Sequence, residues 1–148
     1  ASTVGRDSLE PALSRASGGI SLSDGDAYNV LHASDLAWTA SGTATLETAL
    51  MLCPMIIVYR VTRLTYALAR LLVRVDFIGM ANIIAGEKVV PELIQGDLTA
   101  ERIAAESRTI LNDRALRERM IAKLSEVRAR LGSPGAAVRT ADIALAMM

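Results

Sequence analysis

The chain has 148 residues, of which 51% are hydrophobic and 22% charged, so it is long and apolar enough for one folded domain and is not expected to be disordered. Its 16 basic residues balance 16 acidic ones, which argues against a nucleic-acid-binding protein. A single cysteine, Cys53, excludes an internal disulfide or a zinc cluster and suits a reducing compartment. A single histidine, His32, argues against a catalytic triad or a multi-histidine metal site.

The first predicted elements are short and are separated by turn residues. A helix is expected over residues 8–16, where two glycines follow it, and a short strand over 20–22. Asp26 is typical of a helix N-cap, and the helix that it starts is expected to end at His32. The opening of the chain lacks the pattern of a secretory leader, and we expect the chain to be a piece of a longer protein.

The next part of the chain alternates strand and helix. Residues 36–40 predict a buried strand that stops at Ser-Gly-Thr, and a helix is expected over 44–52. Pro54 ends that helix, and the β-branched run at 55–59 is the clearest strand in the sequence. No apolar run reaches the length of a membrane span.

The pattern beyond this strand predicts more short elements and then a helical tail. We expect a helix over 62–75, a short strand over 77–80, a loop over 81–86 and a helix near 88–95.

From Thr99 onward the sequence predicts only helices. Thr99 and Asp113 are expected to cap two of them, and the last is expected to run from Ser-Pro at 133–134 to Met148.

The order of these elements predicts an α/β fold. Strands and helices that alternate at this spacing form a parallel sheet with helices on both faces, here an incomplete, Rossmann-like half of a doubly wound domain. We expect this nucleotide-sugar-binding part over residues 1–98. Residues 99–148 are expected to form a C-terminal helical tail that packs on it or on a domain that the chain lacks.

The junction between strand 36–40 and the following helix is a candidate phosphate site. Ser41-Gly42-Thr43 would place a helix N-terminus at the carboxyl end of a parallel strand, with unpaired N–H groups that favour an anion. Ala44 lies in the same first turn, and Glu47 lies one turn further, where a carboxylate could accept hydrogen bonds from a ribose diol. Alternatively, a hydroxyl is merely an N-cap and Glu47 a surface acid that compensates the helix dipole.

A second candidate is the basic stretch that contains no acidic residue between 48 and 75. Arg63, Arg70 and Arg74 are seven and four residues apart and would share one helical face, with leucines beside them. Such a helix could lie on an anionic lipid surface or accept acyl chains, and it could equally be a core helix with a solvated arginine face.

Asn82 is the third candidate, because we expect it in a loop just past a strand, at the sheet edge where ligands collect. Its amide can donate and accept at once, which suits a sugar hydroxyl or a phosphate oxygen. An asparagine after a strand is also common turn chemistry. We assign no function to His32 or Cys53.

Together and in this order, these segments resemble the C-terminal part of lipid-A-disaccharide synthases, which are GT-B glycosyltransferases of a family 19-like type. The likeness runs from about residue 26 to the end. The matching stretches are ASGTATLE at 40–47, CPM at 53–55, VYR at 58–60, LT at 64–65, RLLV at 70–73, NIIAG at 82–86 and VPELIQ at 90–95. The chain departs from the family at Ala81, where proline is usual, and at Glu87, where a basic residue is usual.

The resemblance implies a function. The intact enzyme joins UDP-2,3-diacylglucosamine to 2,3-diacylglucosamine 1-phosphate in a β-1,6 linkage and releases UDP, in an inverting reaction without metal or cofactor. This chain would be the donor-binding part and inactive alone, because the acceptor site and the base belong to the N-terminal half.

The resemblance also assigns residues to roles. The nucleotide would be held by Ser41, Gly42, Thr43, Ala44 and Glu47. The donor sugar would lie near Tyr59, Arg60, Asn82, Gly86 and Glu92, with Asn82 in a supporting catalytic role. The membrane or acyl surface would comprise Arg63, Leu64, Arg70, Leu71 and Arg74.

The implied partners are the two acylated sugars and an anionic membrane surface, without nucleic acid. By resemblance, the protein is peripheral on the cytoplasmic side of the inner membrane of a Gram-negative bacterium and could form a homodimer through its tail. Two alternatives stay open: a non-catalytic module that binds a membrane surface or a nucleotide, and another UDP-sugar enzyme, such as a different GT-B transferase or an epimerase.

Overall fold

The computed structural model describes residues 6–15, 18–62, 65–66, 76–132 and 135–147. Most of the predicted helix 62–75 lies outside these residues. So do all five residues of the expected membrane surface, which are Arg63, Leu64, Arg70, Leu71 and Arg74.

The fold is α/β, as the sequence predicts, with an open three-stranded parallel sheet in the order β1-β2-β3. In chain order the elements are α1 (Arg6–Leu13), α2 (Ala27–Ala33), β1 (Ala37–Ala40), α3 (Thr43–Leu50), β2 (Met55–Tyr59), α5 (Met80–Ala85), β3 (Glu92–Ile94), the short 3₁₀ helix η1 (Gln95–Asp97), α6 (Ala100–Asn112), α7 (Arg114–Arg130) and α8 (Ala136–Ala146).

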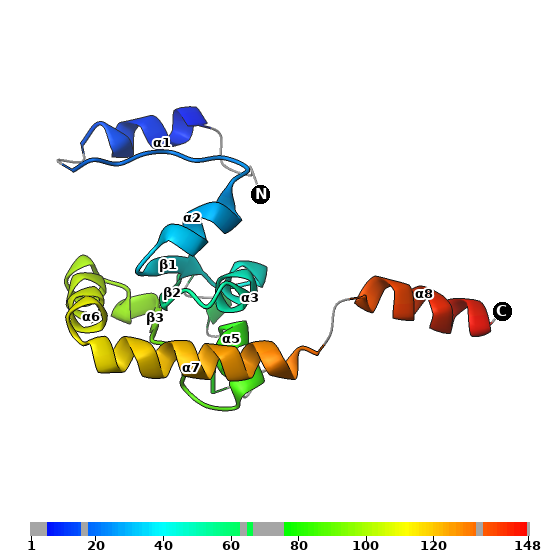
Figure 1. Ribbon diagram of the computed structural model, residues 1–148. Coiled ribbons are helices and arrows are strands. Elements are labelled where there is room, and N and C mark those ends of the chain that lie inside the picture. Colours follow the sequence, from blue (N-terminus) through cyan, green and yellow to red (C-terminus); the bar gives the residue numbers. More distant parts are fainter. Residues whose placement is uncertain (1–5, 16–17, 63–64, 67–75, 133–134, 148) are drawn as a thin grey trace.

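The register brings Ala37 opposite Met55 and Ile57 opposite Glu92. Figure 1 shows α3 and α5 on one side of the sheet and α6 on the other, while α7 runs along the body beside them. This is the arrangement that parallel strands require, because each strand must be followed by a crossover that returns the chain to the same end of the sheet.

The core lies between the sheet and these helices. In β2 the side chains of Met55, Ile56 and Ile57 are fully buried, as expected for a central parallel strand covered on both faces. Helix α7 contributes Leu124 and Val127 to the same hydrophobic cluster. The first two tail helices therefore pack on the Rossmann-like part, while the division at residue 98 stays a prediction.

Several predicted elements are confirmed. Strand 55–59 has the predicted bounds, and helices form close to 26–32 and 44–52. Thr99 caps α6, its hydroxyl accepting from the Arg102 amide at 3.2 Å. Asp113 caps α7 by accepting from the Leu116 amide at 2.9 Å.

Four other predicted elements are wrong. Residues 20–22 form no strand, and Ile20 is exposed. Residues 77–79 form no strand either, because the amides of Ile78 and Gly79 are bound by a side chain rather than by a neighbouring strand. The predicted loop at 81–86 is helix α5, and the predicted helix near 88–95 contains β3.

Strand β1 forms where it is predicted but is not a buried strand. It is one of the two edge strands of the described sheet, so Trp38 is 62% exposed and only Thr39 is buried. The Trp38 indole N–H donates to the Ser107 hydroxyl of α6, and Thr39 pairs with Thr48 of α3 at 3.3 Å on the other face.

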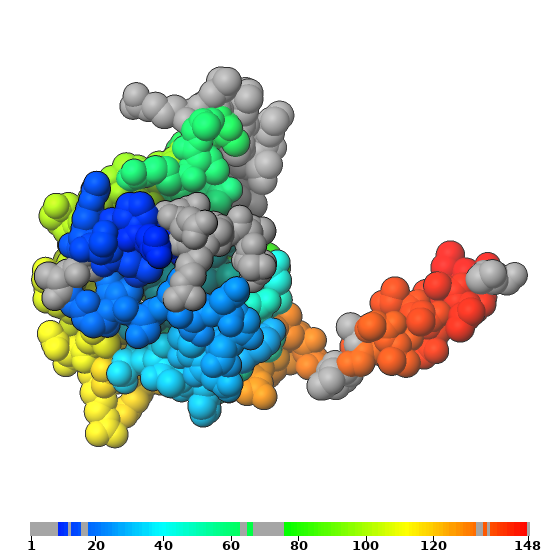
Figure 2. Space-filling view, turned by 90° about the horizontal axis from the view of Figure 1, so that it is seen from above, coloured from blue at the N-terminus to red at the C-terminus, as the bar shows by residue number. Residues whose placement is uncertain are grey.

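Helix α8 stands away from the rest of the molecule in both views (Figures 1 and 2). Its side chains Val138, Ile143 and Leu145 are exposed. Among the described residues, no helix is both long enough and apolar enough to cross a membrane.

Candidate nucleotide-binding site

The turn between β1 and α3 has a backbone that only glycine adopts readily. Gly42 has φ 130° and ψ −158°, a region in which a side chain is strained. A Cβ on Gly42 would meet no atom within 4 Å, so the space beside this backbone is open. Both properties suit a ligand that approaches the main chain closely.

Helix α3 begins directly after this glycine, so the amides of Thr43 and Ala44 belong to its first turn. The first N–H groups of a helix have no carbonyl one turn earlier and carry the positive end of the dipole. No side chain caps this helix at Gly42. The Ser41 amide extends the sheet ladder to the Val58 carbonyl at 3.3 Å. The turn thus offers backbone donors to an anion at the carboxyl end of a parallel strand.

Glu47 lies four residues beyond Thr43, on the same face of α3, and its side chain is half-buried. The residues predicted to bind the nucleotide therefore lie together, in the turn and in the first two turns of α3.

The turn is tied to the start of α5. The Ser41 hydroxyl donates to the Ile78 carbonyl at 3.3 Å, and the Met80 amide donates to the Thr45 hydroxyl at 3.2 Å. The same Thr45 hydroxyl donates to the Gly42 carbonyl at 2.8 Å, and Thr45 is fully buried. These links fix the position of Gly42 relative to α5.

Asn82 is not in a loop. It lies in α5, is fully buried, and its amide group bonds within the chain: Nδ2 donates to the Val90 carbonyl and to Glu92 Oε1, each at 2.9 Å. Its Oδ1 accepts from the amides of Val89 and Val90 at 2.8 and 2.9 Å. The expectation that Asn82 lies in a loop is therefore wrong: it lies in α5, where it holds the connection from α5 to β3.

Glu92 also makes contacts within the chain. Its Oε2 accepts from the Ile78 amide at 3.0 Å and its Oε1 from the Gly79 amide at 2.9 Å. Gly79 is a residue that the sequence analysis did not identify. A Cβ there would collide with Ile57, so the segment passes against β2 only because it has no side chain at that point.

Arg60 and Tyr59 lie at the carboxyl end of β2. The Arg60 guanidinium donates to the carbonyls of Gln95 and Leu98 at 3.2 and 2.5 Å, so it holds the connection from β3 to α6. Tyr59 is half-buried.

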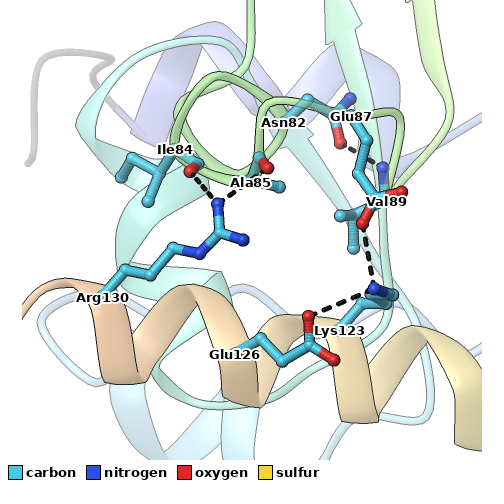
Figure 3. Close-up of polar contacts among 8 residues, drawn as sticks. All are labelled: Asn82, Ile84, Ala85, Glu87, Val89, Lys123, Glu126 and Arg130. Carbon is cyan, nitrogen blue, oxygen red and sulfur yellow. Dashed lines mark hydrogen bonds and ion pairs between the residues drawn. The ribbon is translucent and has the colours of Figure 1, made fainter.

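Gly86 lies at the opposite end of α5 from Met80, where it is the left-handed C-cap with φ 72°. Figure 3 shows this end of α5 facing α7. Arg130 donates to the carbonyls of Ile84 and Ala85 at 2.9 and 2.8 Å. A cation at the last carbonyls of a helix satisfies groups that the helix itself cannot.

Glu87 and Ala81, the two positions at which the sequence departs from the expected family pattern, both make contacts within the chain. Glu87 forms an ion pair with Lys123 of α7 at 3.0 Å, and Lys123 also pairs with Glu126 (Figure 3). Both pairs raise the pKa of Lys123. Ala81 is fully buried in the first turn of α5.

A pocket lies at the opposite end of the sheet, near the amino ends of β1 and β2. This open pocket of about 190 Å³ is lined by residues of α2, α7 and the segment before β2, including His32, Asp35, Cys53 and Arg117. Burial raises the pKa of the Cys53 thiol, and the charge of Asp35 raises it further. Among the described residues, no group of three or more metal-ligating side chains is present.

An open parallel sheet with a glycine turn at the carboxyl end of a strand is typical of Rossmann-like α/β domains, and it is consistent with a half of the GT-B type. The family model for lipid-A-disaccharide synthetase matches residues 11–143, and the chain belongs to this family.

Two of the curated relatives match the whole chain, and a third matches most of it. A lipid-A-disaccharide synthase of Anaeromyxobacter dehalogenans (strain 2CP-1 / ATCC BAA-258) is 49% identical over 149 residues, which cover 100% of this chain and 39% of that protein. The Geobacter sulfurreducens synthase is 44% identical over 148 residues, 100% of this chain and 38% of that protein. The Myxococcus xanthus synthase is 48% identical over 127 residues, 86% of this chain and 33% of that protein. The chain thus spans between a third and two fifths of the length of these relatives.

Proposed function

We propose that this chain is the donor-nucleotide-binding part of a lipid-A-disaccharide synthase. The complete enzyme would transfer the diacylglucosamine unit of UDP-2,3-diacylglucosamine to 2,3-diacylglucosamine 1-phosphate, with inversion, and release UDP. The observation that carries the proposal is the open Gly42 turn at the start of α3, with Glu47 one turn further on the same helix.

The turn supports a role in binding the diphosphate. In this transfer the leaving UDP gains negative charge, and without a metal that charge must be met by fixed dipoles and cations. The amides of Thr43 and Ala44 would supply dipoles that need no reorganisation.

Arg60, which the resemblance places near the donor sugar, is a weak candidate for such a cation, because its guanidinium already binds two carbonyl oxygens. We propose that Arg60 supports the site by holding the end of β3 beside it.

Glu47 would bind the ribose. Thr43 and Glu47 share one face of α3, so a nucleotide with its phosphates at the turn would bring its ribose toward the carboxylate. A carboxylate accepts two hydrogen bonds, which matches a vicinal diol.

The chain alone is expected to bind donor nucleotide without transferring sugar, because the acceptor site and the base would belong to the part of the enzyme that precedes it. We propose further that the complete protein is peripheral on the inner membrane, facing the cytoplasm, and that α8, with its exposed apolar residues, contributes to a homodimer. The residues expected at the lipid surface lie outside the described part of the chain, so no structural observation favours the alternative of a membrane-binding module.

Isothermal titration tests the proposal. The wild-type chain should bind UDP weakly but saturably, and Glu47→Gln should weaken that binding about tenfold, which corresponds to about 1.4 kcal/mol. Glu118→Gln is the matched control, because Glu118 is an exposed carboxylate of α7 that pairs with Arg114. A wild-type chain that is folded by circular dichroism and gives no UDP binding would contradict the proposal.

A chimera tests transfer. In it, this chain replaces the matching part of the Anaeromyxobacter dehalogenans relative, to which it is 49% identical. The chimera should form the disaccharide and release UDP, whereas the chain alone should not.

A further inference from the structure

The carboxylate of Glu92 is the centre of a small group of hydrogen bonds. Three donors converge on its two oxygens: the amides of Ile78 and Gly79 and the side-chain amide of Asn82, at 2.9 to 3.0 Å. The Ile78–Met80 segment lies outside the sheet ladder, so this side chain replaces the carbonyl partners that a strand would have given it.

Asn82 in turn fixes Glu92. Its amide bridges the Glu92 carboxylate and the Val90 carbonyl, while its oxygen accepts from two amides of the same loop. Asn82 is fully buried, and its two bonds to Val90 are buried as well, so bulk water competes little with them. Glu92 is therefore held on one side by Asn82 and β3, and it holds the Ile78–Met80 segment on the other.

The segment that Glu92 holds is the one that touches the phosphate turn. Ile78 accepts the hydroxyl of Ser41, and Met80 donates to the hydroxyl of Thr45. Thr45 links Met80 to the turn, because the hydroxyl that accepts from Met80 also donates to the Gly42 carbonyl. These hydrogen bonds, joined through the backbone of Ile78–Met80, thus connect Glu92 to the backbone of Gly42.

We propose that Glu92 is a positioning residue for the diphosphate of the donor nucleotide, acting through Ile78–Met80, Ser41 and Thr45 on the Gly42 turn. This inference rests on the proposed function and deepens it. Glu92 does not touch the sugar in this role. It keeps the turn in the one backbone geometry in which its amides point at the phosphates.

The test uses Glu92→Gln in the whole chain. Glutamine keeps the size but has one acceptor oxygen, so an NH₂ group faces at least one of the three donors. Glu106→Gln is the matched control, because Glu106 is a half-buried carboxylate of α6, on the other side of the sheet from α5 (Figure 1).

Two ligands separate positioning from general destabilisation. By NMR titration, Glu92→Gln should weaken UDP binding about tenfold and leave the binding of uridine, which lacks phosphate, unchanged. Glu106→Gln should change neither. If Glu92→Gln lowered the affinity for UDP and for uridine equally, Glu92 would have only a structural role, and the inference would be overturned.

Hydrogen exchange in the free protein gives a second readout. The amides of Ile78, Gly79, Met80 and Thr45 should exchange about tenfold faster in Glu92→Gln, while the amide of the buried Ile110 in α6 keeps its protection. Equal loss of protection at Ile110 would indicate global unfolding and would overturn the inference.

Thr45→Val keeps the inference testable if Glu92→Gln does not fold. Valine keeps the shape of threonine and removes the hydroxyl that joins Met80 to Gly42. It should produce the same difference between UDP and uridine, whereas Thr109→Val on exposed α6 surface should not. Unchanged UDP affinity in both Glu92→Gln and Thr45→Val would overturn this inference and leave the proposed function standing. A wild-type chain that does not bind UDP would overturn both.

Discussion

The indole Nε1–H of Trp38 donates to the hydroxyl of Ser107 at 2.9 Å and so joins the edge strand β1 to helix α6 across 69 residues of sequence. Trp38 is the only tryptophan of the chain, and Ser107 is buried although the indole is largely exposed. The environment of the Trp38 indole therefore depends on whether α6 is packed against the sheet.

Ser107→Ala should remove this bond and lower the free energy of unfolding by about 0.5–1 kcal/mol, because the exposed indole can then donate to water. Tryptophan fluorescence during urea unfolding measures it, with a red-shifted native emission expected in the variant. Ser125→Ala on the exposed face of α7 is the control. An unchanged native spectrum and midpoint would contradict the role given to Ser107.

Gly42→Ala should lower the free energy of unfolding by about 1–3 kcal/mol, because φ 130° with ψ −158° lies in a region that is essentially restricted to glycine. UDP binding should weaken as well, since the turn must change its backbone to relieve the strain. Urea denaturation and UDP titration measure the two effects. Gly96→Ala is the control, because a Cβ on Gly96 also meets open space and its backbone carries no positive φ. If the two alanine variants were equally stable, the strain at Gly42 would be refuted.

Glu87→Lys introduces the basic residue that the resemblance to the family leads us to expect at this position, yet we expect it to lower the Tm. The new cation would face Lys123, which now pairs with Glu87 at 3.0 Å. Glu87→Gln removes the pair without adding repulsion and should lower the Tm less. The difference between the two variants should shrink in 1 M NaCl, because salt screens exposed charges. A salt-independent difference would point to packing instead.

Cys53 should make stability depend on alkaline pH. Burial raises the pKa of its thiol in the folded chain, so the folded protein keeps the proton where the unfolded chain, with a pKa of about 8.5, loses it. The stabilisation is complete below the unfolded pKa and declines as pH rises through the window up to the folded pKa. Thermal unfolding between pH 7 and 10 should therefore show a steeper fall for the wild type than for Cys53→Ala. Parallel curves would contradict this.

Strands and helices are predicted correctly where neighbouring residues determine them. The prediction is wrong where a side chain distant in sequence determines the backbone conformation. Strand 55–59 is a run of apolar and β-branched residues, and Thr99 and Asp113 are caps by residue type, so all three are confirmed. The stretch at 77–80 looks like a strand from its apolar residues. It does not become one because Glu92, more than ten residues away, binds its amides.

The candidate site could also be predicted only in part. The open turn at Gly42 follows from a strand, a glycine and a helix in succession, and its role in binding phosphate stays a prediction. The position of Asn82 was not predictable, because its burial depends on the three-residue strand β3, which is too short to show a period. The role of Gly79 depends on one side chain of β2, and no local pattern reveals it.

Strand β1 has a practical consequence for work with this chain. It is an edge strand of the described sheet, and its outer backbone amides and carbonyls face away from β2 with Trp38 exposed beside them. Such an edge accepts a further strand from any extended segment that reaches it. Preparations of the chain should therefore self-associate as concentration rises, and dilute samples with sedimentation analysis at several loadings will be needed before any affinity is assigned to a monomer.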